Sequence, residues 1–194
     1  PGPAPEPAPG PAPEPAPAMS PEPAPPPSVT PEPSEAMVQA NQMKVESVEQ
    51  LIRSANWSEM KSAADGLLKL DLNQAQAERA STLFDIADLA TFYRGAIGRG
   101  LATLKTGNSF EIVDDLPVIV VEVSPESLSI QYNRRTKTFT IDELPPRLTE
   151  KIASFALSPE QPDSIAGQAL YRLIHPMTRD EYREDTLEVL AAVE

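Results

Sequence analysis

Few residues in this sequence belong to the types that most often carry out catalysis. The 194 residues contain no cysteine, so disulfides, thiolate catalysis and cysteine-based metal centres are excluded. The one histidine, His175, would have to serve in any serine–histidine relay. It ends an apolar segment and precedes Pro176, so we expect it to cap or pack a helix.

Acidic residues gather in two places. Carboxylates are dense over residues 180–188, but Arg179 and Arg183 lie among them. Because carboxylates are favoured at a helix start, we expect a solvated helix face there rather than a metal site. Asp114 and Asp115 lie in a predicted turn, where neighbouring side chains point in different directions. Paired-carboxylate hydrolysis instead needs two acids that face each other across a cleft.

Three closely spaced glycines, Gly95, Gly98 and Gly100, match a phosphate-binding loop only in their spacing. Such a loop should follow a strand and begin a helix, whereas these glycines follow an apolar helical stripe. A glycine in a helix interior costs about 0.5–1 kcal/mol, so we expect a kink or a close approach of another backbone. The sequence therefore predicts no catalytic residue, no metal site and no cofactor.

A basic hairpin tip is the strongest binding candidate. Tyr132, Arg134, Arg135 and Lys137 place three positive charges beside an aromatic ring in a chain of net charge −13. Such a tip could bind a phosphate backbone or a carboxylate-rich partner. The alternative is a soluble turn whose charges protect a sheet edge from aggregation.

Hydrophobic spacing predicts the helices that precede this tip. Val48, Leu51 and Ile52 follow a capping box that begins at Ser47, and a second short helix should end near Leu70. Apolar residues then recur every three or four positions from a start at residues 73–76 to a stop at residues 105–107. This second pattern predicts one long amphipathic helix.

The apolar period changes to two after residue 107, which predicts strands. Val118–Val121 is apolar at every position, so we expect a central strand covered on both faces, as in a small barrel. Four short strands over residues 108–142 predict an antiparallel meander with a turn around residues 134–136. Helices should follow over residues 146–193, the last one opening with a capping box at Thr178.

The N-terminal segment has a composition of its own. Residues 1–34 hold most of the 23 prolines, four glutamates and no base, and repeat Pro-Ala-Pro-Glu-Pro-Ala-Pro from Pro3 and again from Pro11. Alternating proline predicts a disordered, extended polyproline-II tether, and a docking ligand for a proline-binding domain is the alternative. Residues 35–194 should form a single α+β domain, helical over 35–106 and 146–193 with the meander over 108–142.

Several of these segments together resemble a known domain. They are Leu104-Lys-Thr-Gly107, Val120-Val-Glu-Val123 and Phe139-Thr-Ile-Asp-Glu-Leu-Pro-Pro146. The pattern resembles a domain that recurs in uncharacterised predicted envelope proteins of planctomycete-type bacteria, with a β part similar to a small SH3-like barrel. This resemblance implies an extracytoplasmic setting, in the periplasm or cell envelope, and a non-enzymatic role. It brings no catalytic residue to any position here.

The expected function is a non-catalytic interaction or scaffolding module on a proline-rich stalk, with a protein partner that is itself acidic. The strong negative charge opposes generic binding to nucleic acid or anionic lipid, and no apolar stretch is long enough to span a membrane. Two alternatives stay open: an accessory nucleic-acid-binding module that uses the Arg134 hairpin, and a hydrolase with an unrecognised carboxylate site. Because the chain begins with proline, we expect a fragment or processed product.

Overall fold

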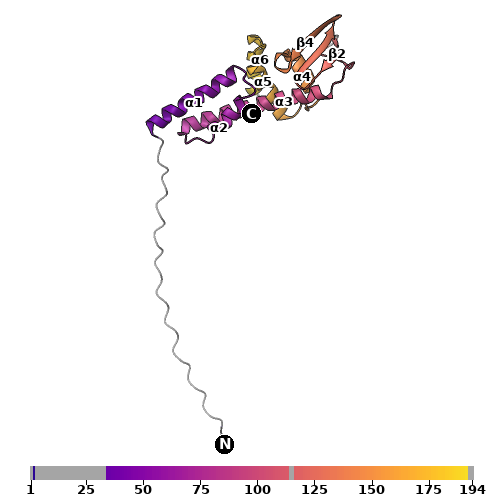
Figure 1. The fold of residues 1–194 in the computed structure, drawn as a ribbon. Coiled ribbons are helices and arrows are strands. Elements are labelled where there is room, and N and C mark those ends of the chain that lie inside the picture. The colour runs from indigo at the N-terminus through magenta and orange to yellow at the C-terminus, as the bar shows by residue number, and fades with distance from the viewer. Residues whose placement is uncertain (1, 3–33, 114–115, 192–194) are drawn as a thin grey trace. The chain divides into compact units, whose positions relative to one another are not determined.

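The computed structural model describes Gly2, residues 34–113 and residues 116–191. The predicted tether over residues 1–34 therefore lies outside the described residues, except for Gly2 and Ser34, and so do Asp114 and Asp115. Residues 34–113 and 116–191 belong to one compact unit. Its elements are six α-helices, one short 3-10 helix and four strands, in the order α1–α2–α3, β1–β4, η1, α4–α6 within the described residues (Figure 1).

The first helix begins earlier than its apolar pattern predicted. α1 (Glu35–Arg53) starts at Ser34, whose hydroxyl accepts a hydrogen bond from the backbone N–H of Met37 at 3.4 Å. The predicted start at Ser47 is wrong, because Ser47 lies inside α1, well after its first turn. The first part of α1 is exposed on most sides, and its apolar residues do not recur at helical spacing, so it carries little of the periodic signal that marks a helix in a sequence.

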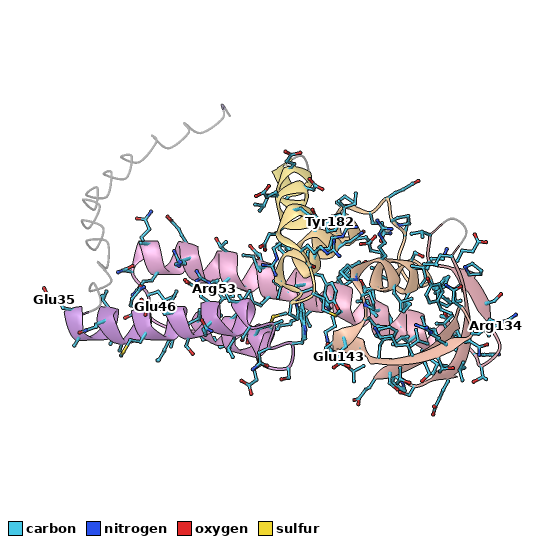
Figure 2. All side chains as sticks on the ribbon, turned by 90° about the horizontal axis from the view of Figure 1, so that it is seen from above. Glu35, Glu46, Arg53, Arg134, Glu143 and Tyr182 are labelled. Carbon is cyan, nitrogen blue, oxygen red and sulfur yellow. The ribbon has the colours of Figure 1, made fainter. Side chains whose placement is uncertain are left out.

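α1 packs on the next two helices. α2 (Met60–Leu67) is short, and α3 (Gln74–Thr103) runs beside α1 and on toward the sheet (Figure 2). The predicted helix start at residues 73–76 is confirmed, and the structure shows a capping box there, in which the Asn73 side chain accepts from Gln76 N–H at 2.9 Å. The Gln76 side chain in turn donates to the Val38 carbonyl at 2.8 Å, which ties α3 to α1.

The glycines of α3 allow close packing of the later helices. A Cβ placed on Gly100 would lie 2.0 Å from the carbonyl oxygen of Ile152, so α4 (Pro146–Ala153) contacts the α3 backbone there. The expectation of a close backbone approach is confirmed at Gly100. Gly167 of α5 (Pro162–Ile174) likewise allows close contact with α3, since its Cβ would lie 3.0 Å from the Leu89 carbonyl oxygen. Both contacts pack α4 and α5 closely against α3.

The strands form one antiparallel sheet in the order β1-β2-β3-β4. Their bounds are β1 (Ser109–Glu111), β2 (Pro117–Val123), β3 (Ser127–Tyr132) and β4 (Arg135–Thr140). A β-bulge interrupts the β2–β3 register between Val120 and Glu122. The 3-10 helix η1 (Ile141–Glu143) follows β4, and α6 (Asp180–Ala191) ends the described chain. The predicted α+β class with a four-stranded meander is confirmed.

The sheet is covered on one face. Val118 and Val120 are buried at 0% and 1% exposure, together with Leu128 of β3, whereas Ile119 is 46% and Val121 41% exposed. The prediction that both faces of β2 are covered is therefore wrong. β1 and β4 lie at opposite edges of the sheet, so the sheet is open, and the helical elements supply one apolar layer rather than two.

Candidate functional site

The β3–β4 hairpin carries all of the residues that the sequence singled out for binding. Its turn consists of Asn133 and Arg134, closed by the pair Tyr132 and Arg135. Both turn residues have positive φ, 48° at Asn133 and 61° at Arg134, which is the type I′ geometry that suits a two-residue hairpin. The sequence placed this turn slightly later, because arginine occupies the position where glycine marks such turns.

Three of the four candidate side chains share one face of the hairpin, and Arg134 lies in the turn. Arg135, Lys137 and Phe139 alternate along β4, and Tyr132 lies on the same face because it pairs with Arg135. The Lys137 Nζ lies 4.8 Å from the centre of the Phe139 ring, close enough for a cation–π contact. The Tyr132 side chain is 42% exposed, and Figure 2 shows Arg134 at the outer end of the hairpin.

The basic side chains of the hairpin differ from most other arginines of the fold. Arg79, Arg94 and Arg172 each pair with a carboxylate from another element, namely Glu49, Asp142 and Glu150. Among the ion pairs of the described residues, none includes Arg134, Arg135 or Lys137. The hairpin therefore presents exposed positive charge that the described part of the chain does not neutralise.

A buried aromatic cluster, which the sequence did not reveal, lies between α3 and α5. Tyr171 is at its centre, with ring centres 4.9 Å from Trp57, 5.4 Å from Tyr93 and 5.2 Å from His175. Tyr171 and His175 are 1% and 0% exposed, and neither the Tyr171 hydroxyl nor the His175 Nε2 has a hydrogen-bond partner among the described residues. Its members come from segments far apart in the sequence, so no local pattern marks them.

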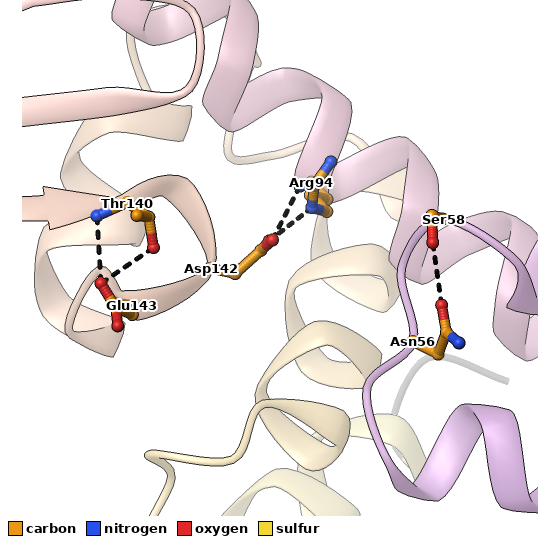
Figure 3. Close-up of polar contacts among 6 residues, drawn as sticks. All are labelled: Asn56, Ser58, Arg94, Thr140, Asp142 and Glu143. Atoms are coloured by element: carbon orange, nitrogen blue, oxygen red, sulfur yellow. Dashed lines mark hydrogen bonds and ion pairs between the residues drawn. The ribbon is translucent and has the colours of Figure 1, made fainter.

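The cluster borders a charged pair. Arg94 donates to Asp142 through Nε at 2.6 Å and Nη2 at 3.0 Å, as drawn in Figure 3. Burial raises the pKa of the Tyr171 phenol, and the Asp142 carboxylate adds to the rise. Burial lowers the pKa of His175, although the backbone and the charge of Asp142 act in the opposite direction. Both groups are therefore held in their neutral forms at neutral pH.

His175 packs inside the protein. It directly follows Ile174, the last residue of α5, and its Nδ1 accepts a hydrogen bond from the backbone N–H of Met177 at 3.2 Å. That bond leaves the ring proton on Nε2. Of the roles that the sequence allowed, packing is the one that the structure supports, and the imidazole does not reach solvent.

The remaining candidates lie apart from the hairpin. Gly95, Gly98 and Gly100 lie within α3, so they do not form a phosphate loop. At the start of α6, the exposed Asp180 pairs with Arg183, and the exposed Glu181 pairs with Arg179. The Thr178 hydroxyl has no hydrogen-bond partner among the described residues, so the predicted capping box there is wrong. In the described segments no three metal-ligating side chains gather, and no helix has the length and apolarity to cross a membrane.

Comparisons with known proteins add no relative. No family model, curated protein or solved structure matches this chain. The resemblance to an envelope domain of planctomycete-type bacteria therefore stays a prediction.

Proposed function

We propose that this chain is a non-catalytic interaction module whose β3–β4 hairpin binds an acidic protein partner. The observation that carries the proposal is the exposed, unneutralised charge of Arg134, Arg135 and Lys137 in a chain of net charge −13. An acidic partner is repelled by most of the surface and attracted at the hairpin, which fixes its orientation. Exposed ion pairs of this kind contribute about 0.2–1 kcal/mol each, so three of them suit a weak, reversible interaction.

The aromatic cluster supports a non-catalytic role. His175 is the single histidine of the chain and is wholly buried, so it cannot transfer a proton to a bound substrate. The proline-rich residues 1–33 and the envelope setting belong to the same proposal, and they are supported by the sequence pattern and the resemblance alone. A stalk would raise the effective concentration of a weak binder near other tethered proteins.

The test measures binding of a fluorescent oligoglutamate peptide to the full chain at about 50 mM and about 150 mM salt, between which screening increases. The unchanged protein should bind the peptide more weakly at the higher salt concentration. Replacing Arg134, Arg135 and Lys137 together with serine should weaken binding by about tenfold or more at the lower salt. The fold should persist, since exposed turn charges contribute about 0.5 kcal/mol or less.

A matched control removes the same charge elsewhere. Lys44, Lys105 and Arg147 are exposed and lie outside the hairpin, and replacing them with serine should change peptide binding little. Equal binding by the parent and the hairpin variant would overturn the proposal. A DNA oligonucleotide serves as the second probe, and its preferential binding would favour a nucleic-acid-binding module instead.

A further inference from the structure

β4 is an exposed edge of the sheet. It pairs with β3 on one side, and in the strand order of the described residues nothing pairs with its other side. Every residue of β4 except Phe139 is exposed. The opposite edge, β1, is only 3 residues long. β4 is therefore the long edge at which another strand could be added.

The register shows which backbone groups face outward. Tyr132 and Arg135 close a two-residue turn and so form a hydrogen-bonded pair. Alternation then directs the N–H and C=O groups of Lys137 and Phe139 toward β3, and those of Thr136 and Thr138 toward the open edge. The Thr140 N–H faces the same way as those of Thr136 and Thr138. It donates to Glu143 Oε2 at 3.3 Å and not to β3, as Figure 3 shows.

Thr136 and Thr138 keep their outward groups exposed. The backbone hydrogen bonds that the described residues form outside helices and strand ladders include none to either threonine. Both side chains are β-branched, which suits an extended backbone. The Thr138 hydroxyl lies 2.8 Å from that of Ser129, so a cross-strand bond orders this part of the edge.

The charges beside this edge select the partner. Arg135, Lys137 and Phe139 point to one face, and an added antiparallel strand would place a residue directly opposite each of them. Residues opposite Lys137 would form the closer, non-hydrogen-bonded type of pair, with Cα atoms about 4.5 Å apart. Complementary side chains are then an acid opposite Arg135, an acid opposite Lys137 and an apolar residue opposite Phe139.

We propose that an extended acidic protein segment binds by adding an antiparallel strand to β4, hydrogen-bonded to the backbones of Thr136 and Thr138. This inference rests on the proposed function and specifies its mode. The partner segment reads, from its N-terminal end, apolar, any residue, acidic, any residue, acidic. The added strand would extend the sheet by one strand and pair with the outward backbone groups of Thr136 and Thr138.

The probe is a blocked peptide with the sequence Thr-Val-Thr-Glu-Thr-Glu-Thr, used with the full chain. In the antiparallel register its valine lies opposite Phe139 and its glutamates lie opposite Lys137 and Arg135. N-methylation of the two threonines between these residues removes the amides that face β4, and should weaken binding by about tenfold or more. N-methylation of the two glutamates alters amides that face away from β4 and should leave the affinity within about twofold.

Variants of the protein test the same bonds from the other side. Thr138→Pro removes one outward N–H and no bond of the β3–β4 ladder, and edge strands accept proline at such positions. It should weaken binding by about tenfold, whereas Thr138→Val loses the hydroxyl, keeps the N–H and should bind as the parent does. Thermal unfolding checks the fold of Thr138→Pro. If that variant unfolds, the N-methylated peptides decide alone.

The outcomes separate this inference from the proposed function. Loss of binding on threonine N-methylation, with retention on glutamate N-methylation, supports strand addition. The opposite result has two parts: the protein binds both N-methylated peptides normally and Thr138→Pro binds the unmodified peptide normally, but the triple serine variant of the hairpin does not bind it. Strand addition is then wrong, and the charged hairpin remains a binding site. If the triple serine variant also binds normally, the proposed function fails.

Discussion

At the scale of single residues, Arg134 and His175 depart most from their usual environments. Arg134 has a φ of 61°, which is unfavourable for a residue with a Cβ atom. Asn133 before it tolerates its own φ of 48° more readily, because asparagine is common in left-handed positions. An arginine where glycine would fit better suggests that its charge, rather than its backbone preference, accounts for its presence at the tip.

Replacing Arg134 with glycine should therefore stabilise the fold while weakening peptide binding. We expect the free energy of unfolding to rise by about 0.5–1 kcal/mol, since the left-handed conformation is no longer strained and only part of the gain is offset by glycine's extra freedom in the unfolded chain. Urea unfolding measures the change. Arg135→Gly, in the adjacent strand, should destabilise instead. A fall in stability for Arg134→Gly would contradict the strained-turn account.

His175 should make folding stability depend on pH. Its pKa is lowered by burial from the ordinary value of 6.5, so between the folded-state pKa and 6.5 the unfolded chain binds a proton that the folded chain does not. The free energy of unfolding should therefore fall as pH drops below about 6.5 and level off above it. His175→Asn keeps an acceptor for the Met177 N–H, and should reduce this pH dependence in urea unfolding. An unchanged pH profile would show that His175 titrates normally.

At the scale of secondary-structure elements, the sequence predicted what local periodicity encodes. The change of apolar period after residue 107 located the meander, and Asn73 marked the start of α3. The prediction that both faces of Val118–Val121 are covered was wrong, because the sequence cannot distinguish an apolar side chain on the outer strand face from a buried one. Ile119 is such an outer side chain. The start of α1 was missed because its first turns bury little apolar surface.

The glycines of α3 should differ sharply in their tolerance of a methyl group. Gly100→Ala would force its Cβ into the Ile152 carbonyl, so α3 and α4 would have to separate, and a loss of about 1–3 kcal/mol is expected. Gly98 has its nearest such contact at 3.9 Å, with the Ile141 side chain. Gly98→Ala should therefore gain up to about 1 kcal/mol of helix propensity. Equal effects in thermal unfolding would show that the α3–α4 contact is looser than described.

At the scale of the whole molecule, the basic hairpin was predictable and the aromatic cluster was not. Tyr132, Arg134, Arg135 and Lys137 are neighbours in sequence, so their charge was evident before the fold was known. Trp57, Tyr93 and Tyr171 meet only when the loop between α1 and α2 packs against α3 and α5. The exposed edge of β4 also depends on the complete sheet, since strand order decides which strand remains at an edge.

Removing residues 1–33 should leave the folded unit intact. Ser34 would still cap α1, and the deleted sequence is dominated by proline, alanine and glutamate, with few large apolar side chains to bury. We expect the melting temperature to change by no more than a few degrees, about the effect of 1 kcal/mol or less. A larger fall would show that this segment contributes to the core.

An acidic strand bound at the open edge of the hairpin would change the amide hydrogen exchange of β4 in the full chain, residue by residue. Without peptide, the outward amides of Thr136 and Thr138 should exchange rapidly, whereas those of Lys137 and Phe139, bonded to β3, should be protected. A saturating amount of the acidic peptide should protect Thr136 and Thr138 and leave the amides of α1 and α6 unchanged. Binding that left Thr136 and Thr138 in rapid exchange, or that protected helical amides instead, would contradict the account.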